Sequence, residues 1–287
     1  MGKAAAQLAV SQPAISKSVT DLERLLGVRL LERSRQGVEP TNYGTALLKW
    51  SAVTFDNLRQ GVDEIAFLAD PTAGEVRVSS TEVMTAGLLP AVIDRLSRQY
   101  SRMTFTVIQA PTILEQYRDL RERNVDLILG RVVLPITDDD LDLEILFEDR
   151  LSIVAGLDSK WQRRRKINPR ELLDEPWALP PYDTYIGSIV KDAFRGKNLD
   201  PPRMTVASAS IQLYTALLAT GRFLAIRPNS SLRLAGKRLS EKALPVGLSL
   251  KPVHVGIVTL RDRATSPAVK LFIECARAVA KVLSKAN

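Results

Sequence analysis

The side chains best suited to chemistry lie on one face of a predicted helix near the start of the sequence. Apolar residues recur at i, i+4, i+7 and i+11, which predicts a buried stripe. The stripe consists of Ile15, Val19, Leu22 and Leu26. The opposite face carries small or hydrogen-bonding side chains, namely Pro13, Ser16, Lys17, Thr20 and Arg24, with Gln12 at the tip. Such a face can approach another surface closely, as a helix in the major groove of DNA must.

A tight turn between two short helices is needed to position this face. Ala9 and Val10 can form the turn after an alanine-rich first helix. Ser11 is suited to be the N-cap of the second helix, because its hydroxyl can accept a hydrogen bond from an unpaired amide of the first turn. Pro13 is tolerated there because first-turn amides have no acceptor within the helix.

A small β-hairpin is predicted to follow the second helix. Gly27 stands where a helix commonly ends with a left-handed residue. Residues 28–33 and 38–40 then read as two short strands, and this wing brings Arg33 and Arg35 to where they can contact phosphates. The alternative for Arg33 is an ion pair within the domain, with Glu32 or Asp21 as its partner.

The run AAAQLAVSQPAISKSVTDLERLLGVRLLERS resembles the helix-turn-helix of LysR-type transcriptional regulators. The alternative is an amphipathic helical pair of an ordinary domain, but the resemblance continues in the right order through the rest of the chain. It implies a winged helix-turn-helix over residues 1–41 that binds double-stranded DNA. The expected DNA-binding residues are Ser11, Gln12, Pro13, Ser16, Lys17, Thr20, Arg33 and Arg35.

The resemblance also implies a further helix before the alanine run, whereas here Met1 lies almost directly on it. The simplest account is a start codon assigned too late or a shortened chain. The alternative is a domain that is naturally short, which would leave apolar surface exposed and weaken DNA binding.

A long helix is predicted from a cap at Thr41 to about residue 69, with a length of roughly 40 Å. Its apolar residues lie close to a three-four spacing, and they are Leu47, Trp50, Val53, Leu58, Val62, Ile65 and Leu68. A solitary helix with such a stripe needs a partner. In the family this linker helix, here residues 42–70, pairs with its twin in a dimer, and tetramers are common, so we expect a homodimer or homotetramer. The alternative is that the stripe packs on its own chain.

Composition is that of an ordinary globular protein. The 287 residues include 45% hydrophobic and 25% charged residues, and 40 Lys and Arg against 32 Asp and Glu give a net charge of +8. A basic chain suits a polyanionic partner. Cys275 stands alone, which excludes an internal disulfide and favours a reducing cytoplasmic location. No export signal and no apolar run long enough to cross a bilayer is visible, so we expect no membrane partner.

After a break at residues 70–74, strands alternate with helices, which predicts an α/β domain over residues 75–287. The resemblance implies that this domain is the two-lobed, periplasmic-binding-protein-like effector domain of the family. Lobe I would then comprise residues 75–155 and 251–287, and lobe II residues 156–250.

In such a domain a small-molecule effector binds beyond the carboxyl ends of strands and near helix N-termini, which suit an anion. Three strand-to-helix junctions carry small hydroxyl residues, at Ser80 and Thr81, at Thr112, and at Ser210. Thr184 is a further candidate in lobe II. The alternative for each is simple helix capping, which uses the same atoms.

Arg131 follows an apolar strand and could form bidentate hydrogen bonds with a carboxylate or phosphate of the effector. It could equally pair with Asp126 or Asp149. The expected effector is therefore a small molecule, and an anionic group would suit Arg131.

Nothing in the sequence predicts an enzyme. One histidine and one cysteine cannot form a Cys/His metal cluster, and no nucleophile elbow or phosphate-binding glycine loop is present. The acidic run at residues 138–140 is expected to be a solvated loop. We therefore expect no catalytic residues, no metal site and no cofactor. The alternative function is a cytoplasmic small-molecule-binding protein with a defective DNA-binding domain.

Overall fold

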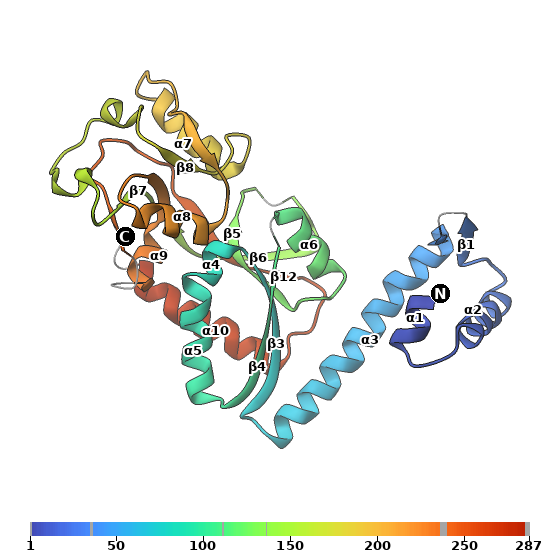
Figure 1. Ribbon diagram of the computed structural model, residues 1–287. Coiled ribbons are helices and arrows are strands. Elements are labelled where there is room, and N and C mark those ends of the chain that lie inside the picture. The colour runs from blue at the N-terminus through green and yellow to red at the C-terminus, as the bar shows by residue number, and fades with distance from the viewer. Residues whose placement is uncertain (1, 35–36, 111, 136, 236–239, 285–287) are drawn as a thin grey trace. The chain divides into compact units, whose positions relative to one another are not determined.

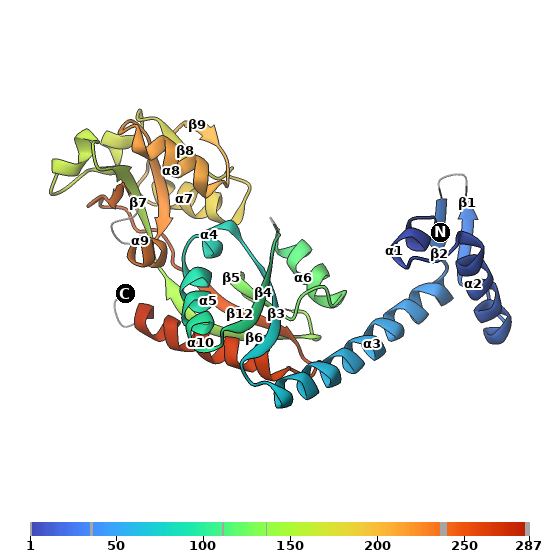
Figure 2. The same cartoon turned by 60° about the horizontal axis from the view of Figure 1, so that its bottom comes forward.

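The computed structural model describes residues 2–34, 37–110, 112–135, 137–235 and 240–284 (Figures 1 and 2). The chain divides into two compact units, residues 1–62 and 63–287. The boundary between the units falls inside a long helix. Among the described residues, no helix is both long and apolar enough to cross a membrane.

The first unit contains the predicted helix pair. Its elements, with the helix that leaves it, are α1 (Gly2–Gln7), α2 (Gln12–Leu26), β1 (Leu31–Ser34), β2 (Gly37–Pro40) and α3 (Asn42–Ala69). Ala9 lies in the turn between α1 and α2 with a φ of 53°. The Ser11 hydroxyl accepts a 3.3 Å hydrogen bond from the amide of Ala14. Gly27 ends α2 in the left-handed region, at φ 70°. The predicted cap, turn and terminator are all confirmed.

The predicted burial of the apolar stripe on α2 is wrong in part. Ile15 and Val19 are half-buried, whereas Leu22 is 38% and Leu26 46% exposed. The helix that contacts α2 is α1, which has only six residues and therefore covers a short length of the stripe.

The wing leads directly into α3. Strands β1 and β2 pair antiparallel, and Leu31 lies opposite Pro40. The Thr41 hydroxyl accepts a 3.0 Å hydrogen bond from the amide of Gly44 and so caps α3 as predicted. A Cβ at Gly44 would lie 2.1 Å from the carbonyl oxygen of Leu30, so only glycine allows the helix to begin so close to the wing.

The apolar stripe of α3 is exposed at most of its predicted positions. Trp50, Leu58, Val62, Ile65 and Leu68 are exposed, whereas the predicted members Leu47 and Val53 are half-buried. The predicted stripe contained a five-residue step between Val53 and Leu58, which shifts it to another face of the helix. A seven-residue repeat continues the exposed stripe instead, and we call this set the α3 seam: Leu48, Phe55, Leu58, Val62 and Ile65.

The second unit contains two five-stranded sheets, each the centre of a lobe. Lobe I has the strand order β4-β3-β5-β12-β6. Its strands are β3 (Ala73–Ser80), β4 (Arg102–Gln109), β5 (Leu127–Val132), β6 (Leu141–Asp149) and β12 (Val253–Leu260). Its helices are α4 (Glu82–Thr85), α5 (Leu88–Gln99), α6 (Ile113–Arg121) and α10 (Pro267–Ser284). Strand β3 is parallel to β4 and β5, and β12 is antiparallel to β5 and β6.

Lobe II has the strand order β11-β7-β10-β8-β9. Its strands are β7 (Leu151–Gly156), β8 (Trp177–Leu179), β9 (Met204–Ala207), β10 (Leu224–Pro228) and β11 (Glu241–Ala243). Its helices are η1 (Lys160–Arg163), η2 (Pro169–Leu172), α7 (Tyr185–Arg195), α8 (Ile211–Ala219) and α9 (Asn229–Ala235). Because β6 and β7 lie in different sheets, the first crossing between the lobes is at Arg150, earlier than the boundary expected after residue 155.

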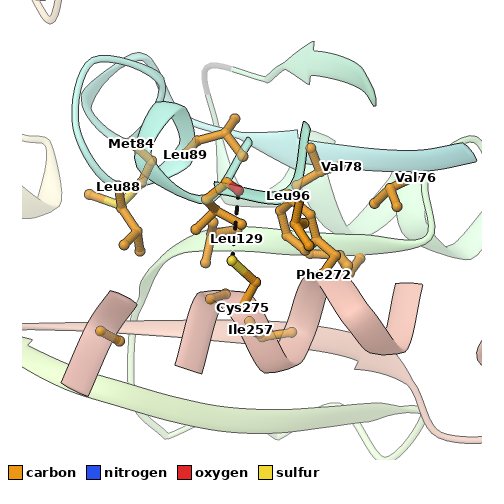
Figure 3. Packing of buried hydrophobic residues seen from close by; sticks show 14 of the residues in the cluster. Val76, Val78, Met84, Leu88, Leu89, Leu96, Leu129, Ile257, Phe272 and Cys275 are labelled. Atoms are coloured by element: carbon orange, nitrogen blue, oxygen red, sulfur yellow. Dashed lines mark hydrogen bonds between the residues drawn. The ribbon is translucent and has the colours of Figure 1, made fainter. Parts of the chain in front are cut away.

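The core of lobe I lies between its sheet and the helices α5 and α10 (Figure 3). Figure 3 shows Val76, Val78 and Leu129 from the sheet close to Phe272 and Cys275 from α10. The Cys275 thiol contacts the carbonyl oxygen of Val92 at 3.7 Å, and burial raises its pKa. Cys275 therefore behaves as a core residue, and its thiolate form is disfavoured.

Lobe II is stabilised by a buried ion pair between Arg227 of β10 and Glu241 of β11. The guanidinium donates to both carboxylate oxygens, at 2.7 and 3.2 Å, and both side chains are at most 2% exposed. Arg227 also donates a 2.7 Å hydrogen bond to the hydroxyl of Thr215 on α8. The pair thus fixes β10, β11 and α8 relative to one another.

We expect Glu241→Gln to lower the free energy of unfolding by about 3–5 kcal/mol, because it leaves the Arg227 charge buried without its counter-charge. The matched control is Glu144→Gln. Glu144 accepts two similar hydrogen bonds, at 2.7 and 2.8 Å, from Arg277, but this pair is 39–53% exposed. Its loss should cost about 1 kcal/mol or less. Urea unfolding followed by far-UV circular dichroism measures both, and equal losses would contradict the prediction.

Candidate DNA-binding and effector sites

The polar face of α2 is open to solvent as the sequence predicts. Gln12, Lys17 and Thr20 are exposed, and Ser16 is half-buried. The Thr20 hydroxyl donates a 2.9 Å hydrogen bond to the carbonyl oxygen of Ser16, so its lone pairs still point outward for a further donor. Pro13, also exposed, presents no amide. Gln12, Lys17 and Thr20 can therefore make close contacts with another surface, whereas Arg24 of the same face pairs with Asp21.

Two of the expected phosphate contacts cannot be placed. The side chain of Arg33 and the whole of Arg35 lie outside the described part of the chain. Of the two carboxylates considered as partners of Arg33, Asp21 pairs with Arg24 at 3.1 Å. Ser11 is exposed, and its hydroxyl serves as the α2 cap.

In lobe I the end of β3 brings three hydroxyl groups to one junction. Ser80 is fully buried and donates a 2.7 Å hydrogen bond to the carbonyl oxygen of Leu129 on β5, which is a structural role. Thr81 is the N-cap residue of α4 but makes no capping hydrogen bond with its side chain. The hydroxyls of Ser79 and Thr81 are buried and have no hydrogen-bond partner among the described residues. Buried polar atoms without partners are rare and mark places where another polar molecule binds.

The other hydroxyl candidates are helix caps. Thr112 forms a capping box with Glu115 at the start of α6 and is exposed. Thr184 accepts a 3.2 Å hydrogen bond from the amide of Gly187 at the start of α7. Ser210 accepts a 3.3 Å hydrogen bond from the amide of Leu213 at the start of α8. The capping alternative is therefore observed at all three positions.

Arg131, on β5, differs from the other charged residues of the lobes. Its side chain is partly buried, and it makes no hydrogen bond or ion pair with any residue that the structure describes. Burial lowers its pKa, whereas the nearby Asp149, Tyr185 and Tyr214 raise it. Tyr185 and Tyr214 belong to lobe II, so the electrostatic surroundings of this guanidinium include residues of both lobes.

Neither of the carboxylates expected as alternative partners neutralises Arg131. Asp126 is bound by Arg77 at 2.7 Å and by Arg263 at 2.8 Å. Asp149 accepts hydrogen bonds from the amide of Ser230, at 3.0 Å, and from the hydroxyl of the same residue. The guanidinium of Arg131 is therefore available to a bound anion.

Two residues around these junctions, Gln116 and Glu82, were not predicted. Gln116 of α6 is buried, and its amide nitrogen has no partner among the described residues. It lies next to Gly130, where a Cβ would be 3.9 Å from the Gln116 amide. Glu82 of α4 accepts hydrogen bonds from the Ser210 hydroxyl at 3.3 Å and the Gln212 amide at 3.2 Å. No local pattern identifies these residues, because their partners are distant in sequence.

Two of the three carboxylates in the acidic run at residues 138–140 form ion pairs with an arginine. Arg121 of α6 contacts Asp138 at 2.6 Å and Asp140 at 2.7 Å. These hydrogen bonds lower the pKa of Asp140 and raise that of Arg121. The run thus stabilises the loop before β6, rather than being only a solvated segment.

Comparison with known proteins identifies both parts of the chain. Residues 1–45 match the family described as bacterial regulatory helix-turn-helix protein, lysR family, and residues 69–281 match the LysR substrate binding domain. The chain is 28% identical over 286 residues to the HTH-type transcriptional regulator GbpR of Azospirillum brasilense, covering 96% of this chain and 81% of that protein. It is 24% identical to the transcriptional dual regulator GltC of Bacillus subtilis, covering 91% and 86%.

Solved structures show the same fold. A full-length OxyR variant from Pseudomonas aeruginosa matches with a TM-score of 0.66 at 22% identity, covering 98% of this chain and 89% of that one. Full-length CbnR in complex with its target DNA matches with a TM-score of 0.58 at 22% identity, covering 97% and 93%. The effector binding domain of QuiR in complex with shikimate matches with a TM-score of 0.58 at 16% identity, covering 73% and 98%.

The family matches cover the helix-turn-helix and the two lobes in the predicted order, and the relatives are transcription regulators rather than enzymes. The predicted family, fold class and type of function are therefore confirmed. The chain belongs to the LysR family of DNA-binding transcription regulators, which join a helix-turn-helix to an effector-binding domain.

Proposed function

We propose that a small-molecule effector binds between the two lobes, next to Arg131, and changes how the helix-turn-helix binds or bends DNA. The single observation that carries this proposal is the partly buried Arg131 guanidinium, which makes no ion pair with the described residues and is influenced electrostatically by Tyr185 and Tyr214 of the other lobe. The buried hydroxyl of Thr81 supports the same location. A carboxylate or other anion on the effector would satisfy the guanidinium.

In this proposal each of three parts of the chain has a separate function. Residues 1–41 bind duplex DNA, with Gln12, Ser16, Lys17 and Thr20 of α2 toward the groove and the wing arginines toward phosphates. Residues 42–70 hold two subunits together, and residues 75–287 bind the effector. Two similar proteins support the DNA-binding and effector-binding roles. CbnR has been solved with its target DNA, and the QuiR effector domain has been solved with shikimate.

The subunits are proposed to associate along the α3 seam. The residues that α3 buries are Gly44, Asp56 and Gln60, whereas the seam residues are exposed, with Phe55 at 70%. A helix that buries polar residues and exposes a heptad stripe is stabilised by a second apolar helix. A dimer would also present two recognition helices to two half-sites of one operator. We propose a homodimer as the minimum unit, from which a homotetramer can form.

The competing function is small-molecule binding without specific DNA recognition. The exposure of Leu22 and Leu26 on α2 favours it, because exposed apolar residues suggest an incompletely packed DNA-binding domain. A gel-shift experiment with DNA flanking the gene decides between the two. Binding to that DNA in preference to random duplex supports the regulator, and equal binding to both supports the competing function.

Lys17→Ala should weaken DNA binding and reduce the log–log salt slope by about one, because one fewer phosphate is neutralised. Fluorescence anisotropy at several salt concentrations measures both quantities. The charge-matched control is Lys270→Ala on the exposed side of α10 in the second unit, which should leave the slope unchanged. An unchanged slope for Lys17→Ala would remove Lys17 from the DNA-binding face.

Leu58→Asp should convert the protein to a monomer of about the protomer mass, 31.7 kDa, because two carboxylates would be buried in the paired seam. Light scattering coupled to gel filtration measures the mass. Trp50→Asp is the control. Trp50 is similarly exposed, 65% against 63% for Leu58, but lies off the heptad. A dimer that survives Leu58→Asp would contradict the α3 seam as the interface.

Arg131→Met should abolish the response of DNA binding to carboxylate effectors while leaving the affinity for DNA alone unchanged, because Arg131 belongs to the second unit. The measurement is a gel shift on the DNA upstream of the gene, with and without a set of small carboxylates. A response that persists in Arg131→Met would place the effector elsewhere.

A further inference from the structure

The N-terminus of α8 in lobe II already holds a carboxylate, which comes from lobe I. Oε1 of Glu82 accepts a 3.3 Å hydrogen bond from the Ser210 hydroxyl and a 3.2 Å hydrogen bond from the Gln212 amide. The partial positive charge of a helix N-terminus is a natural place for an anionic ligand. Here the protein supplies that anion itself, so a carboxylate of the effector would compete with Glu82 for the same donors.

The second oxygen of Glu82 has a different role. Oε2 makes no hydrogen bond with the part of the chain that the structure describes, and the side chain is only partly buried. An ionised carboxylate oxygen accepts hydrogen bonds but cannot donate one. It can therefore bind a hydroxyl or an ammonium group and would repel a second carboxylate.

Strand β3 pairs with β5 in parallel register, with Ser80 opposite Leu129, so Glu82 and Arg131, each two residues further on, lie at the same edge of the sheet. The Tyr214 hydroxyl donates to the carbonyl oxygen of Ser208. Burial raises the pKa of Tyr214, Arg227 lowers it, Glu82 raises it and Arg131 lowers it. One phenol thus lies close to the guanidinium from β5 and to the carboxylate from α4.

The remaining carboxylate of the site is fixed. Both oxygens of Asp149 accept hydrogen bonds from Ser230, through the amide and the hydroxyl. Burial raises the pKa of Asp149, and the guanidinium groups of Arg131 and Arg233 lower it. The carboxylate with an oxygen open to a ligand is therefore that of Glu82, which disfavours a second negative charge close to it.

We infer that the effector is a monocarboxylate that also carries a hydrogen-bond donor, a hydroxyl or an ammonium group. Its carboxylate binds Arg131 of lobe I, and its donor binds the open oxygen of Glu82. This inference rests on the proposed effector site between the lobes. It excludes simple dicarboxylates, whose second charge meets Glu82 at α8.

The test is calorimetric binding of two matched series of acids to the full chain. One series is propionate, lactate, alanine and malonate, and the other is phenylpropionate, phenyllactate, phenylalanine and benzylmalonate. Within a series that binds, the hydroxy or amino acid should bind about tenfold or more tightly than its parent acid, since one hydrogen bond to a charged group is added. The dicarboxylate should bind more weakly than the parent. Comparison of the hydroxy and amino acids identifies the donor.

Glu82→Gln tests whether Glu82 causes this preference. The amide oxygen can still accept from Ser210 and Gln212, but the negative charge is lost, so the disadvantage of the dicarboxylate should largely disappear. The control is Glu171→Gln in lobe II. Glu171 likewise accepts from a backbone amide at a helix start, that of Asn168 at 2.9 Å. This variant should keep the preference of the unsubstituted protein.

The possible failures are distinguishable. A dicarboxylate that binds more tightly than the hydroxy and amino acids, in a manner that Arg131→Met abolishes, overturns the inferred class while the effector site stands. Binding of any acid that Arg131→Met leaves unchanged overturns the effector site itself. Absence of binding in both series also overturns the inferred class. If Glu82→Gln still binds the dicarboxylate more weakly than its parent acid, to the same degree as the unsubstituted protein, the proposed role of Glu82 is overturned.

Discussion

A carboxylate from one lobe caps a helix of the other, and the arrangement of the effector domain around the proposed site follows from this contact. Glu82 and Ser210 are 128 residues apart in sequence, yet their side chains are 3.3 Å apart. The contact requires the end of β3 and the start of α8 to face each other. Because the first amides of α8 would otherwise need water or a ligand, the hydrogen bonds of Glu82 stabilise the approach of the two lobes. Any ligand that enters must then accommodate the remaining charge of Glu82.

Capping and ligand binding use the same atoms, and the structure separates the two roles residue by residue. Thr112, Thr184 and Ser210 each accept a backbone amide and serve their helices. Thr81 occupies an equivalent position but leaves its buried hydroxyl without such a bond. The difference leaves the Thr81 hydroxyl, more than those of the three caps, available to a water or to the proposed effector. Sequence position alone could not make this distinction, because all four residues precede a helix.

Features decided by neighbouring residues were predictable from the sequence, and those decided by distant residues were not. The Ser11 cap and the left-handed Gly27 depend on a few consecutive residues, and both are observed. The exposure of Leu26 depends on how much of α2 another helix covers. The pairing of Glu82 with α8 and the change of sheet at Arg150 depend on the tertiary fold. The half-burial of Leu47 and Val53 in the predicted stripe of α3 likewise depends on which parts of the fold cover the helix.

Helix α3 imposes the last constraint, because it belongs to both units of the chain. The boundary between the units falls between Val62 and Asp63, inside the helix and beside a residue of the α3 seam. A covalent path from the effector domain to the helix-turn-helix therefore passes through the same helix that is proposed to join the subunits. Coupling between two ligands of a protein is typically about 1–3 kcal/mol, which a modest rearrangement of such a seam can supply. In this proposal, an effector that rearranges the paired α3 seams changes the spacing of two recognition helices without contacting DNA.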